Sequence, residues 1–360
     1  MNIDKYTRSE ILNFNSREYA PDRKDLDKKC DLSLNINPCG VSERVILKLK
    51  SIDSKKLSHY YLENKELLNE IASYVKANPE QIMLGDGCDG CLQMIANTFI
   101  NKGEEVIIPI PTFHRYEFHT ILMGGKPIFV PMINFELNFK DILKKANKNS
   151  KILFLCDPNN PTGISIEKTV KEELIKNFNG IVVIDEALAD ITDVNGTSLL
   201  KKYDNLIIVR SFSKSFGLAS LRIGYIISNP KIIEQIKKTS SPFKVNGVAQ
   251  ELALEALKDK DYIKSSIEYI NKNRIFLISN LEKIGLKCTN SITTNFLADI
   301  SNISKDSTEL VEKLKERGIL ITDAKAFRVP RNIYIRISVA TEEENFQFIN
   351  VLSELKNSKV

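Results

Sequence analysis

Four clusters of polar or reactive side chains follow apolar stretches of the sequence. The first centres on Lys214, a primary amine set among small hydroxyl and aromatic side chains at 211–217. Removing such an amine from water lowers its pKa and favours its use as a nucleophile. Ser211, Ser213 and Arg222 lie close to it in the sequence and are the donors that a phosphate monoester dianion needs. This cluster predicts a reactive amine beside a phosphate site.

The other three clusters offer a carboxylate, an amide and an anion-binding turn. Asp185 ends an apolar stretch, where a carboxylate is costly to bury unless it meets a cation. Asn160 lies in the turn 157–163, which two prolines make rigid. The glycine-rich turn 85–90 opens a predicted helix, and the free N–H groups at a helix start can bind an anion.

The apolar stretches that precede these clusters alternate with helical patterns. Short β-branched runs occur at 81–84, 105–108, 128–131, 151–156, 181–184, 206–209 and 224–227. This alternation predicts an α/β fold, with a mostly parallel seven-stranded sheet between helices. Such sheets bind ligands at the carboxyl ends of their strands, so we expect the four clusters to meet there.

The rest of the chain predicts a second, smaller unit. Residues 246–285 show an almost unbroken helical pattern, and 286–360 alternate strands and helices as a small α+β domain. We expect 1–49 to be an N-terminal arm and part of the small domain. We expect 50–245 to form the large, ligand-binding domain, with 246–285 as a linking helix.

Composition excludes several classes of protein. The 360 residues carry a net charge of only +5 and their basic residues are scattered, so we expect no nucleic-acid partner. No apolar run approaches the roughly 18 residues of a membrane span, and the N-terminus lacks the pattern of a secretory signal. The six cysteines therefore read as reduced thiols, and we expect a cytoplasmic protein without a membrane partner.

Together the clusters supply what pyridoxal phosphate requires of a protein. These are an amine for a Schiff base, an acid for the pyridine nitrogen, an amide for the ring hydroxyl and a phosphate cup. The gaps of 25, 29 and 8 residues between Asn160, Asp185, Lys214 and Arg222 resemble those of aminotransferases with the aspartate-aminotransferase fold.

Within that superfamily the chain is similar to the histidinol-phosphate aminotransferase group over nearly its whole length. The similarity rests on short motifs: Asn35-Ile36-Asn37-Pro38, the Gly-x-Gly-x-Asp turn, Pro111-Thr112-Phe113, Pro158-Asn159-Asn160-Pro161-Thr162-Gly163, Asp185-Glu186-Ala187, Ser211-Phe212-Ser213-Lys214, Leu221-Arg222-Ile223-Gly224-Tyr225 and Tyr334-Ile335-Arg336-Ile337.

The resemblance implies a role for each cofactor residue. Lys214 would bind the cofactor covalently and then serve as general base and acid. Asp185 would hold the pyridine nitrogen protonated, Asn160 would bond the ring hydroxyl and Phe113 would stack on the ring. The phosphate would be held by the backbone of two residues and by three side chains: Cys88, Asp89, Ser211, Ser213 and Arg222.

The resemblance also implies substrates and a partner. Arg336 would pair with the substrate α-carboxylate, and Asn35 would line the substrate site. The substrates would be an amino acid or amino phosphate, of histidinol-phosphate or aromatic type, and a 2-oxo acid such as 2-oxoglutarate. Tyr60, or Tyr61 if the register slips by one, would reach the cofactor phosphate of a second subunit, which implies a homodimer with shared sites.

The sequence departs from the family pattern in three places. Leu188 replaces a tyrosine that bonds the ring hydroxyl, and Thr322 replaces an arginine that helps to bind the substrate phosphate. Arg328 or Arg331 could compensate for that missing arginine. The Gly-Ser-Asp-Glu type of turn reads Gly-Cys-Asp-Gly at 87–90.

Alternative functions stay open at this point. The motif at 35–40 also resembles threonine-phosphate decarboxylases of cobalamin synthesis, although their His-Gly-Gly element is absent from 1–30. A redox or zinc site built on Cys88 and Cys91, with His114 and His119, is a second alternative. A third is a binding protein without catalytic activity.

Overall fold

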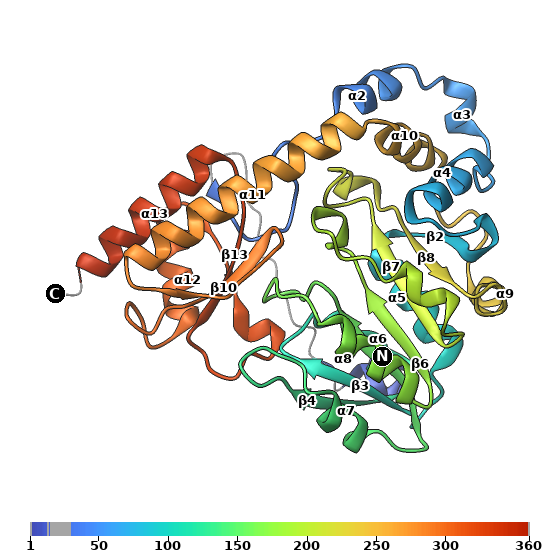
Figure 1. Cartoon of the computed structure of the whole chain (residues 1–360), viewed down its shortest axis with the longest axis horizontal. Helices are drawn as coiled ribbons and strands as arrows, with labels where there is room; N and C mark the ends of the chain where they lie inside the picture. Colours follow the sequence, from blue (N-terminus) through green and yellow to red (C-terminus); the bar gives the residue numbers. More distant parts are fainter. Residues whose placement is uncertain (1, 13, 15–29, 359–360) are drawn as a thin grey trace.

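The computed structural model describes residues 2–12, 14 and 30–358. Figure 1 shows two units, a large one and a small one, connected by the long helix α11 (Lys260–Lys283). The N-terminal turn η1 (Ile3–Tyr6) and helix α1 (Ser9–Leu12) belong to the large unit, since α1 contacts α6 (Arg115–Leu122).

The large unit is built on a seven-stranded sheet. Its strands lie in the order β2 (Ile82–Gly85), β8 (Gly224–Ser228), β7 (Leu206–Ser211), β6 (Ile181–Asp185), β5 (Ser150–Cys156), β3 (Glu105–Ile110) and β4 (Lys126–Pro131). Strand β8 runs antiparallel to both neighbours, and the other pairs are parallel. The predicted mostly parallel sheet of seven strands is thereby confirmed.

Both faces of this sheet are covered, which explains why the central strands are apolar over most of their length. Ile107 packs into a core with α4 (Lys65–Val75), α7 (Phe139–Lys145), α8 (Lys168–Asn177) and α10 (Gly247–Lys258). Its neighbours Val106 and Ile108 pack on the other face with α5 (Gly87–Phe99), α6 and α9 (Pro230–Thr239). Side chains that alternate between two buried faces hold the carboxyl ends of the central strands in fixed positions.

The small unit has its own core. Strands β9 (Lys287–Cys288), β10 (Asn295–Asp299), β13 (Tyr334–Ser338) and β12 (Thr322–Asp323) form an antiparallel sheet. A parallel pair joins β1 (Cys30–Asp31) to β11 (Ile319–Leu320), so the segment after residue 30 lies beside the C-terminal unit. Apolar residues of α11, α12 (Ser307–Glu316) and α13 (Glu342–Asn357) fill the core. The domain limits themselves stay a prediction.

The linking segment is two helices where the sequence pattern predicts one. Helix α10 ends and α11 begins at Asp259, whose side chain accepts a hydrogen bond from the N–H of Tyr262. Helices α2 (Glu43–Lys50) and α3 (Ser54–Ser58) lie along α10. Within the described ranges, no helix combines the length and apolar character that crossing a membrane requires.

The remaining short elements are 3₁₀ turns between strands and helices: η3 (Pro79–Gln81), η4 (Ala189–Ile191), η5 (Thr197–Lys201), η6 (Ala219–Leu221) and η7 (Ala324–Phe327).

Candidate active site

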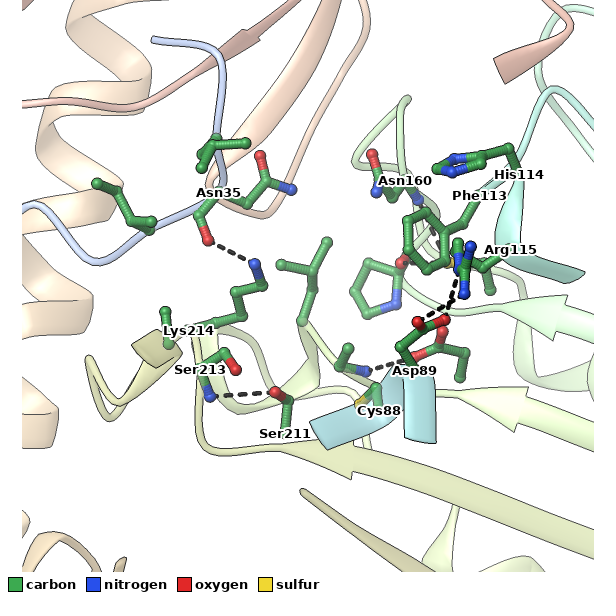
Figure 2. A pocket seen from close by; sticks show the side chains of 18 of the residues that line it. Asn35, Cys88, Asp89, Phe113, His114, Arg115, Asn160, Ser211, Ser213 and Lys214 are labelled. Carbon is green, nitrogen blue, oxygen red and sulfur yellow. Dashed lines mark hydrogen bonds and ion pairs between the residues drawn. The ribbon is translucent and has the colours of Figure 1, made fainter. Parts of the chain in front are cut away.

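A cavity of about 680 Å³ lies where the carboxyl ends of β5, β6 and β7 meet the small unit. It brings together eleven of the residues that the sequence singles out: Asn35, Cys88, Asp89, Phe113, Asn160, Asp185, Ser211, Ser213, Lys214, Arg222 and Arg336. Figure 2 shows Lys214 and Asn35 on one side of the cavity, facing Phe113, Asn160 and His114 on the other.

Lys214 stands in the loop that follows β7, and its Nζ donates to the carbonyl oxygen of Asn35 at 2.7 Å. Gly217 has a φ of +71°, and a Cβ there would overlap the carbonyl oxygen of Gly40. Burial lowers the pKa of Lys214 to about 8, and the positive charge of Arg336 contributes in the same direction. The amine can therefore lose its proton near neutral pH.

Asp185 is the last residue of β6 and is fully buried at the cavity wall. Tyr116 Oη donates to its Oδ2 at 2.8 Å, and the N–H of Ala187 donates to its Oδ1 at 3.0 Å. Burial raises the pKa of Asp185, while these two hydrogen bonds oppose that rise. A buried carboxylate held this way suits a cationic ligand group such as a protonated ring nitrogen.

Sequence reasoning missed Tyr116. Its ring is fully buried and stacks on Phe154, with the ring centroids 4.9 Å apart and the planes 9° from parallel. Tyr116 lies 69 residues before Asp185, and no local pattern connects the two. Only the contact between α6 and the end of β6 shows the pairing.

One corner of the cavity gathers the groups that can bind an anion. Helix α5 begins at Gly87, whose φ is +68°, and a Cβ at Gly87 would lie 2.6 Å from Arg222 Nη2. The guanidinium of Arg222 therefore lies against the start of the helix. Its Nη1 donates to the carbonyl oxygen of Ala219 at 3.1 Å, which helps to fix its position.

Two buried serines complete this corner. Ser211 and Ser213 line the cavity, and Ser211 Oγ accepts from the N–H of Ser213 at 3.0 Å. Cys88 and Asp89 belong to the first turn of α5, whose N–H groups have no partner within the helix. With Arg222, this set of donors matches a phosphate dianion.

The side chain of Asp89 is bound by two residues of α6. Arg115 Nε and Nη2 donate to its two carboxylate oxygens at 2.7 and 2.8 Å, and His119 Nε2 lies 2.8 Å from Oδ1. Burial works to raise the pKa of Asp89, but the hydrogen bonds from His119 and Arg115 hold it below its usual range. Asp89 is therefore a charged carboxylate at the cavity wall.

Arg336 reaches the cavity from the small unit. It stands on β13, is almost completely buried, and its Nη1 donates to Asn160 Oδ1 at 3.2 Å. Its Nη2 donates to the carbonyl oxygen of Ser33 and to Thr322 Oγ1, the latter at 3.1 Å. Arg336 and Asn160 thus lie together at the junction of the two units.

Thr322 is hydrogen-bonded to Arg336 and does not line the cavity. Its hydroxyl accepts from Arg336 and donates to the carbonyl oxygen of Ser33 at 2.8 Å. Arg328 is bound by both carboxylate oxygens of Glu117, at 2.9 and 2.6 Å, and Arg331 lies 3.8 Å from Asp299. Neither arginine lines the cavity, so neither takes the place of the arginine that the family pattern has at 322.

Two apolar side chains and one amide shape the remaining walls. Phe113 lines the cavity, with its ring edge-to-face against Tyr116, and Leu188 lines it while packing with Ile191 and Ile270. Asn35 presents its carbonyl oxygen to Lys214, whereas its side chain bonds Asn295 and Ser338.

Tyr60 does not enter the cavity of its own chain. Its side chain is 86% exposed and stacks on Phe243, with centroids 4.8 Å apart. Tyr61 donates to Glu251 and packs against Gly247, so it is not in the cavity either. A role for Tyr60 at a cofactor requires a second copy of the chain.

Cys88 and Cys91 both lie in the first turns of α5. Cys88 lines the cavity and Cys91 is fully buried behind it. Across the residues that the structure describes, no group of three or more His, Cys, Asp and Glu side chains could hold a metal ion.

The geometry of the cavity fits pyridoxal phosphate. An amine of lowered pKa at Lys214, a buried carboxylate at Asp185 and an anion corner at Arg222 all line one cavity. The glycine at 87 leaves room for the Arg222 guanidinium, and the ring of Phe113 offers a stacking surface. These residues could hold the phosphate, the ring and the reactive carbon of that cofactor.

Comparisons with known proteins show what the whole chain is similar to. The family model for class I and II aminotransferases matches residues 27–352. The histidinol-phosphate aminotransferase of Caldicellulosiruptor saccharolyticus is 36% identical over 338 residues, which cover 92% of this chain and 92% of that protein.

Solved structures confirm the fold. The histidinol-phosphate aminotransferase of Clostridium acetobutylicum is 27% identical, with a TM-score of 0.84 over 91% of this chain and 99% of that chain. The L-threonine-O-3-phosphate decarboxylase of Porphyromonas gingivalis is 26% identical, with a TM-score of 0.78 over 90% and 98%. Aspartate aminotransferase of Thermus thermophilus is 21% identical, with a TM-score of 0.81 over 91% and 92%, which confirms the expected fold type.

Proposed function

The chain belongs to the class I and II aminotransferases and is a pyridoxal-phosphate-dependent enzyme, and from this premise we propose that it transfers the amino group of histidinol phosphate to a 2-oxo acid such as 2-oxoglutarate. The observation that carries this proposal is the similarity, along nearly the whole chain, to a histidinol-phosphate aminotransferase. An aromatic amino acid is the second amino donor that we consider.

The geometry of the cavity supports a role for each cofactor residue. Pyridoxal phosphate, when bound, supplies the electron sink that makes the hydrogen on the amine-bearing carbon of the substrate acidic. Lys214, whose pKa burial lowers to about 8, would take that proton as a base and return it as an acid to the carbon two atoms away, which is a 1,3-proton shift. Asp185 would keep the ring nitrogen protonated, and Tyr116 would keep Asp185 charged. Cys88, Ser211, Ser213 and Arg222 would hold the phosphate.

The substrate anion would meet Arg336. Histidinol phosphate carries a phosphate ester where an α-amino acid carries its carboxylate, so one guanidinium can serve either anion. Asn160 Oδ1 and Thr322 Oγ1 accept from Arg336 and fix its orientation. Because Thr322 adds no charge, Arg336 would bear most of the attraction for the substrate anion, and both donor types should depend on it.

A homodimer is part of the proposal. Apolar side chains cluster on α2, α3 and the segments beside them and are exposed in the single chain: Leu47, Leu49, Leu57, Tyr60, Leu62 and Phe243. Exposed apolar clusters of this kind mark interaction surfaces. A second copy docked there would bring its Tyr60 toward the neighbouring cofactor phosphate. The cytoplasmic location likewise stays a prediction from the sequence.

The test is a panel of amino donors with 2-oxoglutarate: histidinol phosphate, the aromatic amino acids and phosphothreonine. We expect glutamate to form fastest with histidinol phosphate, and we expect Arg336→Gln to lower kcat/KM at least about tenfold for every donor. Glutamate formation from aromatic amino acids alone would refute the proposed substrate while leaving the reaction class intact.

Phosphothreonine decarboxylation is the second candidate function, because the P. gingivalis decarboxylase has the same fold and because Leu188 replaces the usual tyrosine. Release of CO2 from phosphothreonine, without glutamate formation from any donor, would favour that candidate. We expect no CO2.

A further inference from the structure

We propose that Arg115 is a positioning residue of the phosphate corner, where it neutralises Asp89 so that the start of α5 can hold a phosphate dianion. The inference rests on the proposed placement of the cofactor phosphate between α5, Ser211 and Arg222. It concerns two side chains, Asp89 and Arg115, whose pairing the family resemblance does not include.

Asp89 poses an electrostatic problem for this corner. It is the third residue of α5, so its backbone N–H belongs to the anion-binding turn while its carboxylate lines the same cavity. The positive end of a helix attracts any nearby anion, including a side-chain carboxylate. An uncompensated Asp89 would therefore compete with the phosphate for this end of the helix and repel it.

Arg115 compensates the charge of Asp89 by forming a planar, two-point ion pair with its carboxylate. Its Nε and Nη2 donate to the two carboxylate oxygens of Asp89 at 2.7 and 2.8 Å. The guanidinium carbon of Arg115 lies 3.6 Å from the ring centroid of Phe118, and this contact helps to fix the orientation of the guanidinium. His119 adds a further contact to Asp89 Oδ1 at 2.8 Å. Figure 2 shows Arg115 and Asp89 paired at the cavity wall near Cys88.

The pair therefore serves two purposes. It cancels the negative charge that Asp89 brings to the corner, and it occupies both carboxylate oxygens, so the carboxylate cannot cap the N–H groups of α5. Arg222 and the first-turn N–H groups then remain available to the phosphate. Arg115 acts through Asp89 and needs no contact with the cofactor.

The experiment measures the dissociation constant of pyridoxal phosphate by absorbance titration of cofactor-free protein. We expect Arg115→Gln to weaken binding at least about tenfold, because the carboxylate of Asp89 then keeps only its contact with His119 and faces the phosphate without the charge of Arg115. Asp89→Asn keeps the backbone N–H of the turn and removes the carboxylate charge beside the phosphate, so it should tighten binding. The double variant D89N/R115Q should return to within about threefold of wild type, since the charge that Arg115 neutralises is gone.

Arg328→Gln is the matched control. Arg328 also forms a two-point pair with a carboxylate, that of Glu117, and its guanidinium carbon lies 4.0 Å from the ring centroid of Phe129. It does not line the cavity, so removing the same charge there should leave cofactor affinity unchanged. Arg115→Lys, which keeps the charge, should lose less affinity than Arg115→Gln.

A second probe, pyridoxal, carries the ring and the aldehyde but no phosphate. Its affinity should be the same in wild type and Arg115→Gln, because the proposal concerns the phosphate alone. Equal losses for both probes would show a general structural role and overturn the inference. A double variant as weak as Arg115→Gln would overturn it too. Failure of wild type to bind pyridoxal phosphate at all would instead refute the proposed cofactor placement.

Discussion

Tyr116 donates a hydrogen bond to Asp185 and so favours the charged carboxylate. Burial alone raises the pKa of Asp185, and Tyr116 opposes that rise. Tyr116→Phe removes the donor and keeps the ring stacked on Phe154, so the pKa of Asp185 should rise further. A hydrogen bond to a charged group contributes about 1.5–3 kcal/mol, so cofactor affinity should fall at least about tenfold.

Tyr225→Phe is the control for that prediction. Tyr225 is also fully buried, but its hydroxyl has no hydrogen-bond partner among the residues that the structure describes, and it does not line the cavity. The ¹⁵N chemical shift of the ring nitrogen in labelled pyridoxal phosphate should move toward the unprotonated form in Tyr116→Phe and stay unchanged in Tyr225→Phe. An unchanged shift in both variants would mean that Tyr116 does not tune Asp185.

The pKa of Lys214 predicts a pH dependence. Lys214 must be a neutral amine to bond the cofactor, and burial lowers its pKa to about 8. The rate at which cofactor-free protein forms this bond should therefore rise as the pH increases through about 8. Arg336 also lowers the pKa of Lys214, so Arg336→Gln should shift the midpoint to higher pH, whereas Arg328→Gln should not shift it.

Stopped-flow absorbance across a pH series measures that midpoint. A midpoint near the ordinary value for lysine in wild type would show that the cavity does not depress the pKa of Lys214.

Individual residues differ in how far the sequence reveals them. Lys214 and Asp185 each follow an apolar strand in a recognisable motif, so the sequence places them at the sheet edge. Arg115 and Tyr116 carry no such signal, because their partners Asp89 and Asp185 lie 26 and 69 residues away. Their side-chain pairings depend on how α6 packs against α5 and the sheet, which the local sequence does not encode.

At the scale of elements, the loop after β7 depends on a close approach between two backbones. Gly217 has a φ of +71°, and a Cβ there would overlap the carbonyl oxygen of Gly40. Gly217→Ala should lower the free energy of unfolding by about 3 kcal/mol or more, because the strained backbone and the overlap add. Cofactor binding should weaken as well, since Lys214 lies in this loop.

Gly103→Ala separates the two contributions. Gly103 has a φ of +86°, but within the described part of the chain no heavy atom beyond its two sequence neighbours lies within 4 Å of a Cβ placed there. Its substitution should cost only about 1–2 kcal/mol, the price of the backbone conformation alone. Denaturant unfolding of both variants measures the difference, and equal costs would contradict the close approach.

The elements themselves could be predicted well where burial sets the pattern. The central strands of the large sheet are apolar runs because both of their faces are covered, so the sequence predicts their positions. The sequence does not predict the break between α10 and α11, because Asp259 lies inside a stretch that otherwise continues the helical pattern. Asp259 follows the last residue of α10 and caps α11 by accepting a hydrogen bond from the N–H of Tyr262. Packing decides whether the chain continues as one helix or breaks at this residue.

For the whole molecule, the exposed apolar side chains on α2, on α3 and in the loop after α3 predict a dimer. Leu57 and Leu62 are 66% and 75% exposed in the single chain. Leu57→Asp combined with Leu62→Asp should give a monomer with weak cofactor binding. Ile275→Asp, which changes an apolar residue on α11 that is 61% exposed, should leave the dimer intact.

Tyr60→Phe distinguishes assembly from a shared site. It should keep the dimer, measured by sedimentation, while weakening pyridoxal phosphate about tenfold, because the phosphate loses one hydroxyl donor. A wild-type protein that sediments as a monomer with full cofactor affinity would contradict the shared site.

The most direct test is a single turnover. Protein loaded with pyridoxal phosphate is mixed with histidinol phosphate in the absence of any 2-oxo acid, and the cofactor absorbance is followed. We predict complete conversion of the bound cofactor to its amine form, reversal on addition of 2-oxoglutarate, and no conversion in Lys214→Ala. A loaded wild-type protein whose spectrum does not change with histidinol phosphate or with any other amino donor would contradict the account.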